Sequence, residues 1–154
     1  MYFWKRAQIL VAETWAAFYP VTNNDTSLQH PFFPEGVHEL TMFADYRVPQ
    51  ILHHLAILTY PPFLLSLLEH HTPLQPGCRE ELSIRAASVL AVEAIRAEIR
   101  LMDGDSTEQC DVSSVLIDFY LWDLAKKVEM GEQLIEGIET QEVIPAHRTR
   151  SVWY

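Results

Sequence analysis

The chain has 154 residues, 49% of them hydrophobic, and a formal net charge of −10 at pH 7. This length is sufficient for one domain with a sizeable core. The acidic composition, with only 11 Lys and Arg residues, argues against a polynucleotide partner, because binding to a phosphate backbone draws on an extended basic surface. A small anionic ligand is compatible with it, since a single phosphate needs only a few cations or a helix N-terminus.

Apolar residues first recur at helical spacing from Phe3 to Phe18, which predicts a helix with no leader sequence before it. Residues 20–34 are rich in Pro, Asn, Asp and Ser without periodicity and predict a loop. Pro34 and Glu35 suit the first turn of a short helix that we expect to run to about Phe43.

Pro49 suits the first turn of a further helix, predicted over residues 50–60, which the Pro-Pro pair that follows would end. A short apolar helix is predicted over residues 63–70. The longest amphipathic pattern predicts a helix over residues 79–102, and another helical pattern starts near Ser113. No alternating strand pattern of useful length and no internal repeat is present, so the sequence predicts a single all-α domain over residues 1–154.

The sequence also bears on the compartment in which the protein acts. The most apolar window, residues 48–68, contains two His and three Pro, so it lacks the roughly 20 uninterrupted apolar residues that a membrane span needs. Cys78 and Cys110 lack C-x-x-C spacing, which favours free thiols in a reducing compartment. We therefore expect a cytoplasmic protein that does not cross a membrane.

The segment LTMFADYRVPQ, residues 40–50, places Asp45, Tyr46 and Arg47 between two apolar runs. A carboxylate buried there must accept hydrogen bonds, pair with a cation or become neutral, because burial of a lone charge is costly. One interpretation is that Asp45 caps the helix near Pro49 while Arg47 lies on the surface. The other is that Asp45 belongs to a chemical site.

The segment DFYLWD is a second candidate site. Asp118 and Asp123 lie five positions apart, about 140° around a helix, so both can border one wide cavity only at its edges. Two carboxylates among aromatic rings can accept hydrogen bonds from the N–H groups of a purine-like base or a ligand amine, while the rings stack on it. The alternative is a buried helix that exposes both acids.

Neither the histidines nor known catalytic motifs point to a metal or phosphate-loop enzyme. Glu35-x-x-His38 has the spacing of half a bundle metal site, but no matching Glu-x-x-His is present. Other histidines form adjacent pairs, whose members point in different directions, at His53-His54 and His70-His71. We therefore expect no metal. The C-terminal segment IPAHRTRSVWY is basic and aromatic, which favours docking onto the body, with one of its arginines paired to an acid.

The chain resembles the queuosine salvage family, the queuosine 5′-phosphate N-glycosylase/hydrolases, in five segments with the same order and similar spacing. These segments are FWKRAQILVAETW (Phe3–Trp15), LTMFADYRVPQ (Leu40–Gln50), EELSIRAASVLAVE (Glu80–Glu93), DFYLWD (Asp118–Asp123) and PAHRTRSVWY (Pro145–Tyr154).

The resemblance implies an all-helical, bundle-like domain related to helix-hairpin-helix DNA glycosylases. It also implies hydrolysis of queuosine 5′-monophosphate to release queuine for reuse in transfer RNA, without a metal or organic cofactor. The resemblance covers residues 1–154 and corresponds to the C-terminal half of a typical member. We therefore expect the N-terminal half, which forms part of the pocket in that family, to be absent. Whether a separate polypeptide or a second copy of the chain completes the site stays open.

Carried over residue by residue, the resemblance places Phe43 and Asp45 at the nucleoside, with Asp45 as the catalytic carboxylate. It places Asp118 and Asp123 at the queuine base, next to Phe119, where the family often has Tyr. The ring of Phe119 can still stack on the base, but it lacks the hydroxyl that Tyr would provide. Tyr46 is a further expected substrate contact. Three cations are expected either to bind the 5′-phosphate or to form salt bridges that fix the acids: Lys5, Arg47 and Arg148.

The chemistry implied for Asp45 follows from the reaction. N-glycosidic cleavage passes through an oxocarbenium-like sugar, which a fixed carboxylate stabilises; the same group can also activate water or attack directly. Two departures from the family pattern each remove a carboxylate. Gly36 stands where an F-x-D-I acid is expected, and Ser83 replaces the second Glu of E-V-E-I-R-A.

Three functions stay open at this point. The leading one is the hydrolase, favoured by the retained Asp45, Asp118 and Asp123. The second is a truncated or decayed helical module that binds a partner without hydrolysis. The third is a glycosidase of changed substrate, with its base pocket altered by Ser83.

Overall fold

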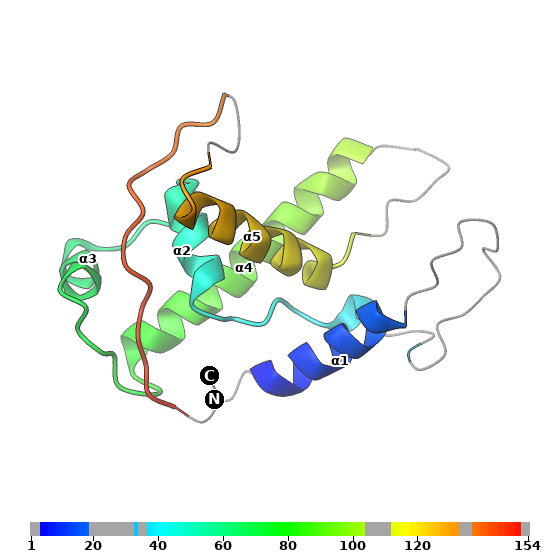
Figure 1. The fold of residues 1–154 in the computed structure, drawn as a ribbon, viewed down its shortest axis with the longest axis horizontal. Helices are drawn as coiled ribbons and strands as arrows, with labels where there is room; N and C mark the ends of the chain where they lie inside the picture. The colour runs from blue at the N-terminus through cyan, green and yellow to red at the C-terminus, as the bar shows by residue number, and fades with distance from the viewer. Residues whose placement is uncertain (1–3, 19–32, 34–36, 104–111, 133–136, 152–154) are drawn as a thin grey trace.

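Helices make up most of the described part of the chain. The computed structural model describes residues 4–18, 33, 37–103, 112–132 and 137–151. Among these residues, β pairing is confined to an isolated bridge between Leu74 and Thr149, so the predicted all-α class is confirmed. The likeness to the helix-hairpin-helix glycosylase fold stays a prediction. The elements in chain order (Figure 1) are α1 (Lys5–Ala17), the 3-10 turn η1 (Val37–Glu39), α2 (Arg47–His54), α3 (Pro62–Glu69), α4 (Arg79–Asp103) and α5 (Ser114–Glu129).

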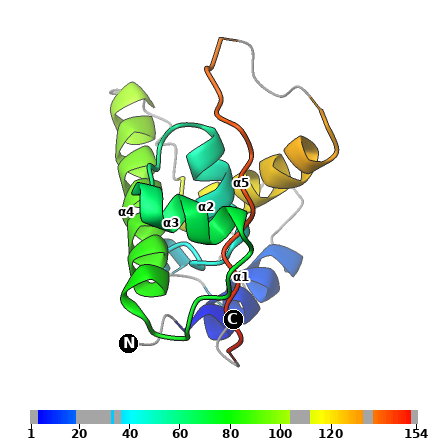
Figure 2. The ribbon, with the colours of Figure 1, turned by 90° about the vertical axis from the view of Figure 1, so that its left-hand side faces the viewer.

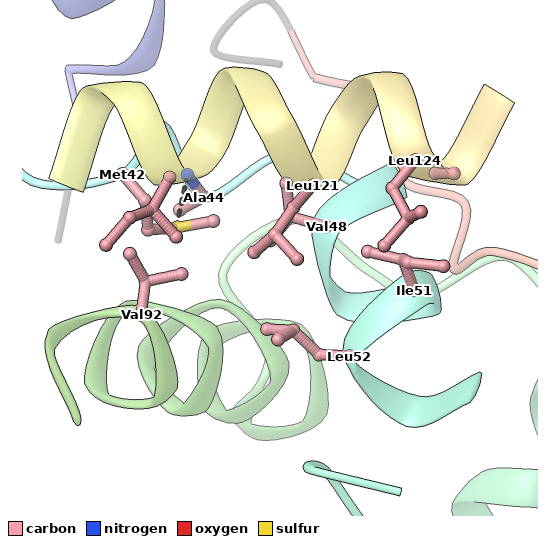
Figure 3. Close-up of a cluster of buried hydrophobic side chains, with 10 residues drawn as sticks. Met42, Ala44, Val48, Ile51, Leu52, Val92, Leu121 and Leu124 are labelled. Carbon is pink, nitrogen blue, oxygen red and sulfur yellow. Dashed lines mark hydrogen bonds between the residues drawn. The ribbon is translucent and has the colours of Figure 1, made fainter. Parts of the chain in front are cut away.

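The main core forms where α2, α4 and α5 meet. Figure 3 shows apolar side chains of these helices pointing toward one another, together with Met42 and Ala44 from the segment that leads into α2. The helical members labelled there are Val48, Ile51, Leu52, Val92, Leu121 and Leu124. Because Met42 and Ala44 are 1% exposed, removal of their side chains from water anchors this segment between helices.

Several predicted helices agree closely with the structure. The observed bounds of α3 and α4 differ from the prediction by at most one residue at either end. α5 begins at Ser114 because the hydroxyl of Ser113 accepts a hydrogen bond from the Leu116 amide (3.3 Å) and thereby caps the helix. No helix in the described ranges combines the length and the apolar character that crossing a lipid bilayer requires.

The helix predicted over residues 34–43 is wrong. Residues 34–36 lie outside the described residues, and the remainder contributes only the turn η1 before the chain becomes irregular. Three successive residues, Met42, Phe43 and Ala44, are all buried, a pattern that an amphipathic helix does not produce. The Phe43 amide bonds to the Asp118 carboxylate rather than to a helical carbonyl. Tertiary contacts therefore override the local preference for helix.

The bounds predicted for α2 are also wrong, because the helix covers Arg47–His54 rather than residues 50–60. It starts early because Asp45 Oδ1 accepts hydrogen bonds from the amides of Arg47 and Val48. It ends early because two following amides turn back to the Leu52 carbonyl. Pro49 lies in the first turn, where its missing N–H costs no helical hydrogen bond.

Residues 137–151, here called the C-terminal strap, run along α2 and past α3 (Figures 1 and 2). Gln50 Nε2 donates a hydrogen bond to the carbonyl of Ile144 (2.7 Å), and the Leu74 amide donates to the carbonyl of Arg148 (2.8 Å). The predicted docking is thus confirmed for the strap, although both of its arginines are exposed. The two aromatic residues that end the chain lie outside the described residues.

Truncation of the core should be costly at α2. Leu52 is 0% exposed, so Leu52→Ala should lower the free energy of unfolding by about 2–5 kcal/mol, through lost burial and a cavity. Urea unfolding followed by circular dichroism measures the change. Leu90→Ala on α4 is the matched control, because its side chain is 70% exposed, and it should change the free energy by less than about 0.5 kcal/mol. Equal losses in both variants would contradict this core.

Candidate active site

Asp45 lies at the N-terminus of α2 and is 6% exposed. Its Oδ1 accepts hydrogen bonds from the amides of Arg47 (3.0 Å) and Val48 (2.9 Å). These bonds confirm that Asp45 caps the helix, although Tyr46 is the residue directly before it. Arg47, which the same interpretation placed on the surface, is half-buried. Both capping bonds end on Oδ1 and neither uses Oδ2, so capping fixes the carboxylate without occupying its second oxygen. The positive end of the helix dipole also favours a negative charge at this place.

Asp118, in the first half of α5, is the second buried acid and is 2% exposed. Its Oδ2 accepts a hydrogen bond from the Phe43 amide (2.9 Å), which brings it to the segment that carries Asp45. Burial raises the pKa of Asp118 to about 7, the Phe43 hydrogen bond opposes this shift, and the negative charge of Asp45 adds to it. The alternative in which α5 exposes both of its acids is thus wrong for Asp118.

Lys5, in the first turn of α1, supplies positive charge to the two acids. Burial lowers the pKa of Lys5, while the charges of Asp45 and then Asp118 partly restore it. The Lys5 Nζ also lies 5.7 Å from the centre of the Tyr46 ring. Helix α1 therefore contributes a cation whose pKa responds to the charges of both carboxylates.

A cleft of about 550 Å³ includes Lys5 and Tyr46 in its lining, whereas Asp45 and Asp118 are not among the residues that line it. Residues from α1, α2, α5 and the strap form its walls, and all three predicted phosphate ligands, Lys5, Arg47 and Arg148, are among them. Negative charge comes from Glu129, whose Oε2 lies 2.7 Å from Arg47 Nη1. The full lining is Lys5, Tyr46, Arg47, Gln50, His71, Glu129, Pro145, Ala146, His147, Arg148 and Thr149.

Aromatic side chains flank the acids on two sides. Phe43 is 4% exposed, and its ring meets that of Phe119 edge to face, with centroids 5.8 Å apart. On the cleft side, the guanidinium of Arg47 lies 5.9 Å from the Tyr46 ring centre and 5.5 Å from that of Trp122. Phe43 and Phe119 therefore pack near Asp118, whereas Tyr46 faces the cleft.

The structure does not bring Asp123 to this place. Its side chain is 60% exposed and pairs with Lys127 of the next helical turn, with Nζ and Oδ2 3.0 Å apart. The difference follows from the helical angle of about 140° between Asp118 and Asp123, because α5 buries the side that carries the first acid. A role of Asp123 at the base stays a prediction.

Three buried polar residues near the acids escaped the sequence reasoning. On α4, Glu81 and Arg85 form an ion pair, with Oε1 and Nη1 2.8 Å apart, and both side chains are nearly inaccessible to solvent. From the strap, His147 is 4% exposed; burial lowers its pKa to about 4, and the charges of Arg85 and Lys5 reinforce the shift. The four-residue spacing of Glu81 and Arg85 within an apolar pattern was a usable signal, whereas the burial of His147 depends on docking of the strap.

The two departures from the family pattern fall in different parts of the chain. Ser83 is exposed on α4, about 200° around the helix from the buried Glu81. Ser83 in place of Glu therefore leaves the buried ion pair of Glu81 intact. Its exposed position lends no support to the idea of an altered base pocket. Gly36 and the Glu35 of the metal motif lie outside the described residues. Among the residues that are described, no group of three or more His, Cys, Asp or Glu could hold a metal ion.

Comparison with known proteins finds relatives along the whole chain. A family model described as queuosine salvage protein matches residues 1–154. Proteins named queuosine 5′-phosphate N-glycosylase/hydrolase are 37% identical in Mus musculus over 153 residues, 37% in Nematostella vectensis over 161 and 36% in Sphaerobacter thermophilus over 152. Each alignment covers 99% of this chain but only 40%, 41% and 39% of the respective relative. The chain thus spans about two fifths of the length of the curated relatives it matches.

The raised pKa of Asp118 predicts a specific dependence of stability on pH. Between its ordinary pKa of 3.8 and about 7, the folded state keeps a proton that the unfolded state loses, so this group's contribution to stability falls as pH rises through that range. Asn does not titrate in this range, so Asp118→Asn removes the loss of stability that accompanies deprotonation of Asp118. Relative to the original chain, the variant should gain a few kcal/mol between about pH 4 and pH 8.

Urea unfolding at several pH values measures the effect. Asp123→Asn, on the exposed side of the same helix, is the matched control and should keep the pH dependence of the original chain. A stability curve for Asp118→Asn that runs parallel to that of the original chain would contradict the raised pKa.

Proposed function

This chain belongs to the queuosine salvage protein family, and from this membership and the geometry of the site we propose that it hydrolyses the N-glycosidic bond of queuosine 5′-monophosphate. The relatives bear the name of this activity. The observation that carries the proposal is the pair of buried acids, Asp45 and Asp118, beside the cation of Lys5. In the reaction, the hydroxyl of water goes to C1′ of the ribose and its proton goes to the released base, queuine.

Asp45 is the catalytic carboxylate in this proposal. As the bond to the base breaks, positive charge develops at C1′ and the ring oxygen of the sugar, and a fixed negative charge stabilises it. The two amides at the start of α2 hold Oδ1 in place, so the carboxylate needs little reorganisation during the reaction. Attack by Asp45 on C1′ and activation of water by Asp45 are both compatible with this position.

Asp118 has the properties of a group that recognises the base. With a pKa of about 7, it can exist with or without its proton near neutral pH, and it therefore can donate as well as accept a hydrogen bond. Its Oδ2 is taken by the Phe43 amide, so Oδ1 is the oxygen that we assign to the base. Phe119, in contact with Phe43, offers an apolar ring for stacking.

The cleft is assigned to the 5′-phosphate. Lys5 joins it to the acids, and Arg47 and Arg148 add positive charge to its walls. Arg47 already pairs with Glu129, which leaves Arg148, exposed on the strap, as the guanidinium best placed for the ligand. Three cations around one cleft favour a small anion even in a chain whose net charge is −10.

We further propose that the chain acts in the cytoplasm, because Cys78 is a free thiol and thiols persist in reducing compartments. The net charge of −10 favours the free nucleotide over a polynucleotide as its substrate. A non-catalytic binding module is the second candidate function. Trp4 and Leu10 are 71% and 67% exposed at α1, and large apolar side chains in solvent favour contact with another protein surface.

Replacement of the catalytic carboxylate should abolish release of the base. The purified chain, incubated with queuosine 5′-monophosphate, should produce free queuine, measured by mass spectrometry, and Asp45→Asn should be about 10²- to 10⁴-fold slower. Asn caps helices as well as Asp does, so α2 should persist in the circular dichroism spectrum. Glu98→Gln, an exposed change on α4, is the control for loss of one acidic charge.

The outcomes separate the candidate functions. Equal rates for the original chain and Asp45→Asn would remove Asp45 from the mechanism. A folded original chain that releases no queuine would favour the binding module.

The assignment of the cleft predicts a difference between two arginines of the strap. Arg148 lines the cleft and Arg150 does not. Arg148→Gln should raise KM for queuosine 5′-monophosphate about tenfold through loss of a charge-assisted hydrogen bond. It should leave KM for queuosine, which lacks the phosphate, unchanged. Arg150→Gln is the matched control; if both variants raise KM for the nucleotide equally, the phosphate does not bind in this cleft.

A further inference from the structure

We propose that Arg85, clamped by Glu81, is a positioning residue that sets the direction of the Asp45 carboxylate through the backbone of Ala44. The proposal rests on the proposed function for its catalytic consequence, but the clamp itself can be observed without activity. Arg85 lies on α4, whereas Ala44 and Asp45 lie on the segment that leads into α2. Neither member of the clamp is among the residues that line the cleft.

The clamp is a chain of hydrogen bonds that begins at the exposed residue Gly77 and continues between buried groups. The Gly77 amide donates to Glu81 Oε2 (3.1 Å), and Glu81 Oε1 accepts from Arg85 Nη1 (2.8 Å). Arg85 Nε then donates to the carbonyl of Ala44 (3.0 Å). Glu81 and Arg85 are 2% and 5% exposed, so the two bonds made by Arg85 act where water does not compete and where the local dielectric is low.

The clamp ends on a backbone conformation that needs support. Ala44 has φ +50°, in the left-handed region that is strained for a residue with a Cβ. The next residue is Asp45, so the orientation of the Ala44 peptide determines where the Asp45 side chain points. Arg85 holds the carbonyl of that peptide from one side, while the amides of Arg47 and Val48 hold Oδ1 from the other.

The same helix contains a matched control for this clamp. Arg96 also donates from Nε to a backbone carbonyl, that of Val112 (3.1 Å), and its Nη1 lies 3.7 Å from Glu93 Oε2. It repeats the chemistry of Arg85 at a place that does not touch the Asp45 segment. Arg85→Lys and Arg96→Lys both keep the charge and both lose the planar guanidinium that makes two directed contacts.

Hydrogen exchange tests the clamp directly. In Arg85→Lys, the amides of Arg47 and Val48 should exchange about tenfold faster, because the Asp45 oxygen that accepts their hydrogen bonds is no longer held. Amides in the middle of α5 should exchange as before, which separates this local effect from general destabilisation. Arg96→Lys should leave the amides of Arg47 and Val48 unchanged.

If Arg85→Lys does not fold, Glu81→Gln tests the clamp from its other end, because it keeps the side-chain shape and removes the charge that holds Arg85. Faster exchange confined to the amides of Arg47 and Val48 is again the expected result. Unchanged exchange at these amides, or equal acceleration in Arg96→Lys, would overturn the proposal.

Activity then tests the catalytic consequence. With queuosine 5′-monophosphate, Arg85→Lys should lower kcat about a hundredfold with little change in KM, as expected for a misplaced reacting group. Adding Ala44→Gly to Arg85→Lys should recover part of kcat, because Gly adopts positive φ without strain. If KM and kcat both fall in Arg85→Lys and the added Ala44→Gly restores neither, the role of the Ala44 backbone is overturned. An inactive original chain that shows the exchange effect would contradict the proposed function and support the clamp.

Discussion

Asp45 and Asp118 bring like charges into the same buried region, and the neighbouring groups offset the electrostatic cost. Backbone amides bond to one oxygen of each acid, the cation of Lys5 faces both, and the pKa of Asp118 rises so that it can be neutral. These contacts join α1, α2, α5 and the segment before α2 at one place. The helical packing around the main core and the chemistry of the site therefore depend on the same buried polar cluster.

The cluster shows why capping is compatible with the catalytic role proposed for Asp45. A cap requires one carboxylate oxygen in a fixed position at a helix N-terminus, and a catalytic carboxylate requires a fixed orientation with an oxygen left for the substrate. Asp45 meets both requirements because its capping bonds use Oδ1. The cost of this arrangement is a left-handed Ala44, which the buried pair of Glu81 and Arg85 supports from α4.

Local patterns were sufficient to predict α3, α4 and the start of α5, because apolar periodicity and capping residues are properties of neighbouring positions. They failed for the segment before α2, whose path depends on a hydrogen bond between residues 75 positions apart. The family resemblance singled out Asp45 and Asp118 for the site, and Lys5 was expected at the 5′-phosphate or in a salt bridge with the acids. It did not single out His147 or Arg85, whose burial arises from tertiary packing, and it did not foresee the exposure of Asp123.

The C-terminal strap has a consequence for biosynthesis. Lys5 and His147 lie near opposite ends of the chain and line the same cleft, so the cleft acquires its last wall only when the strap docks on α2. Contacts between residues so distant in sequence form slowly relative to local helices. A nascent chain still attached to the ribosome at the end of α5 therefore has its acids and its core helices but lacks the strap wall of the cleft. If the cleft binds the phosphate as proposed, that binding requires the docked strap.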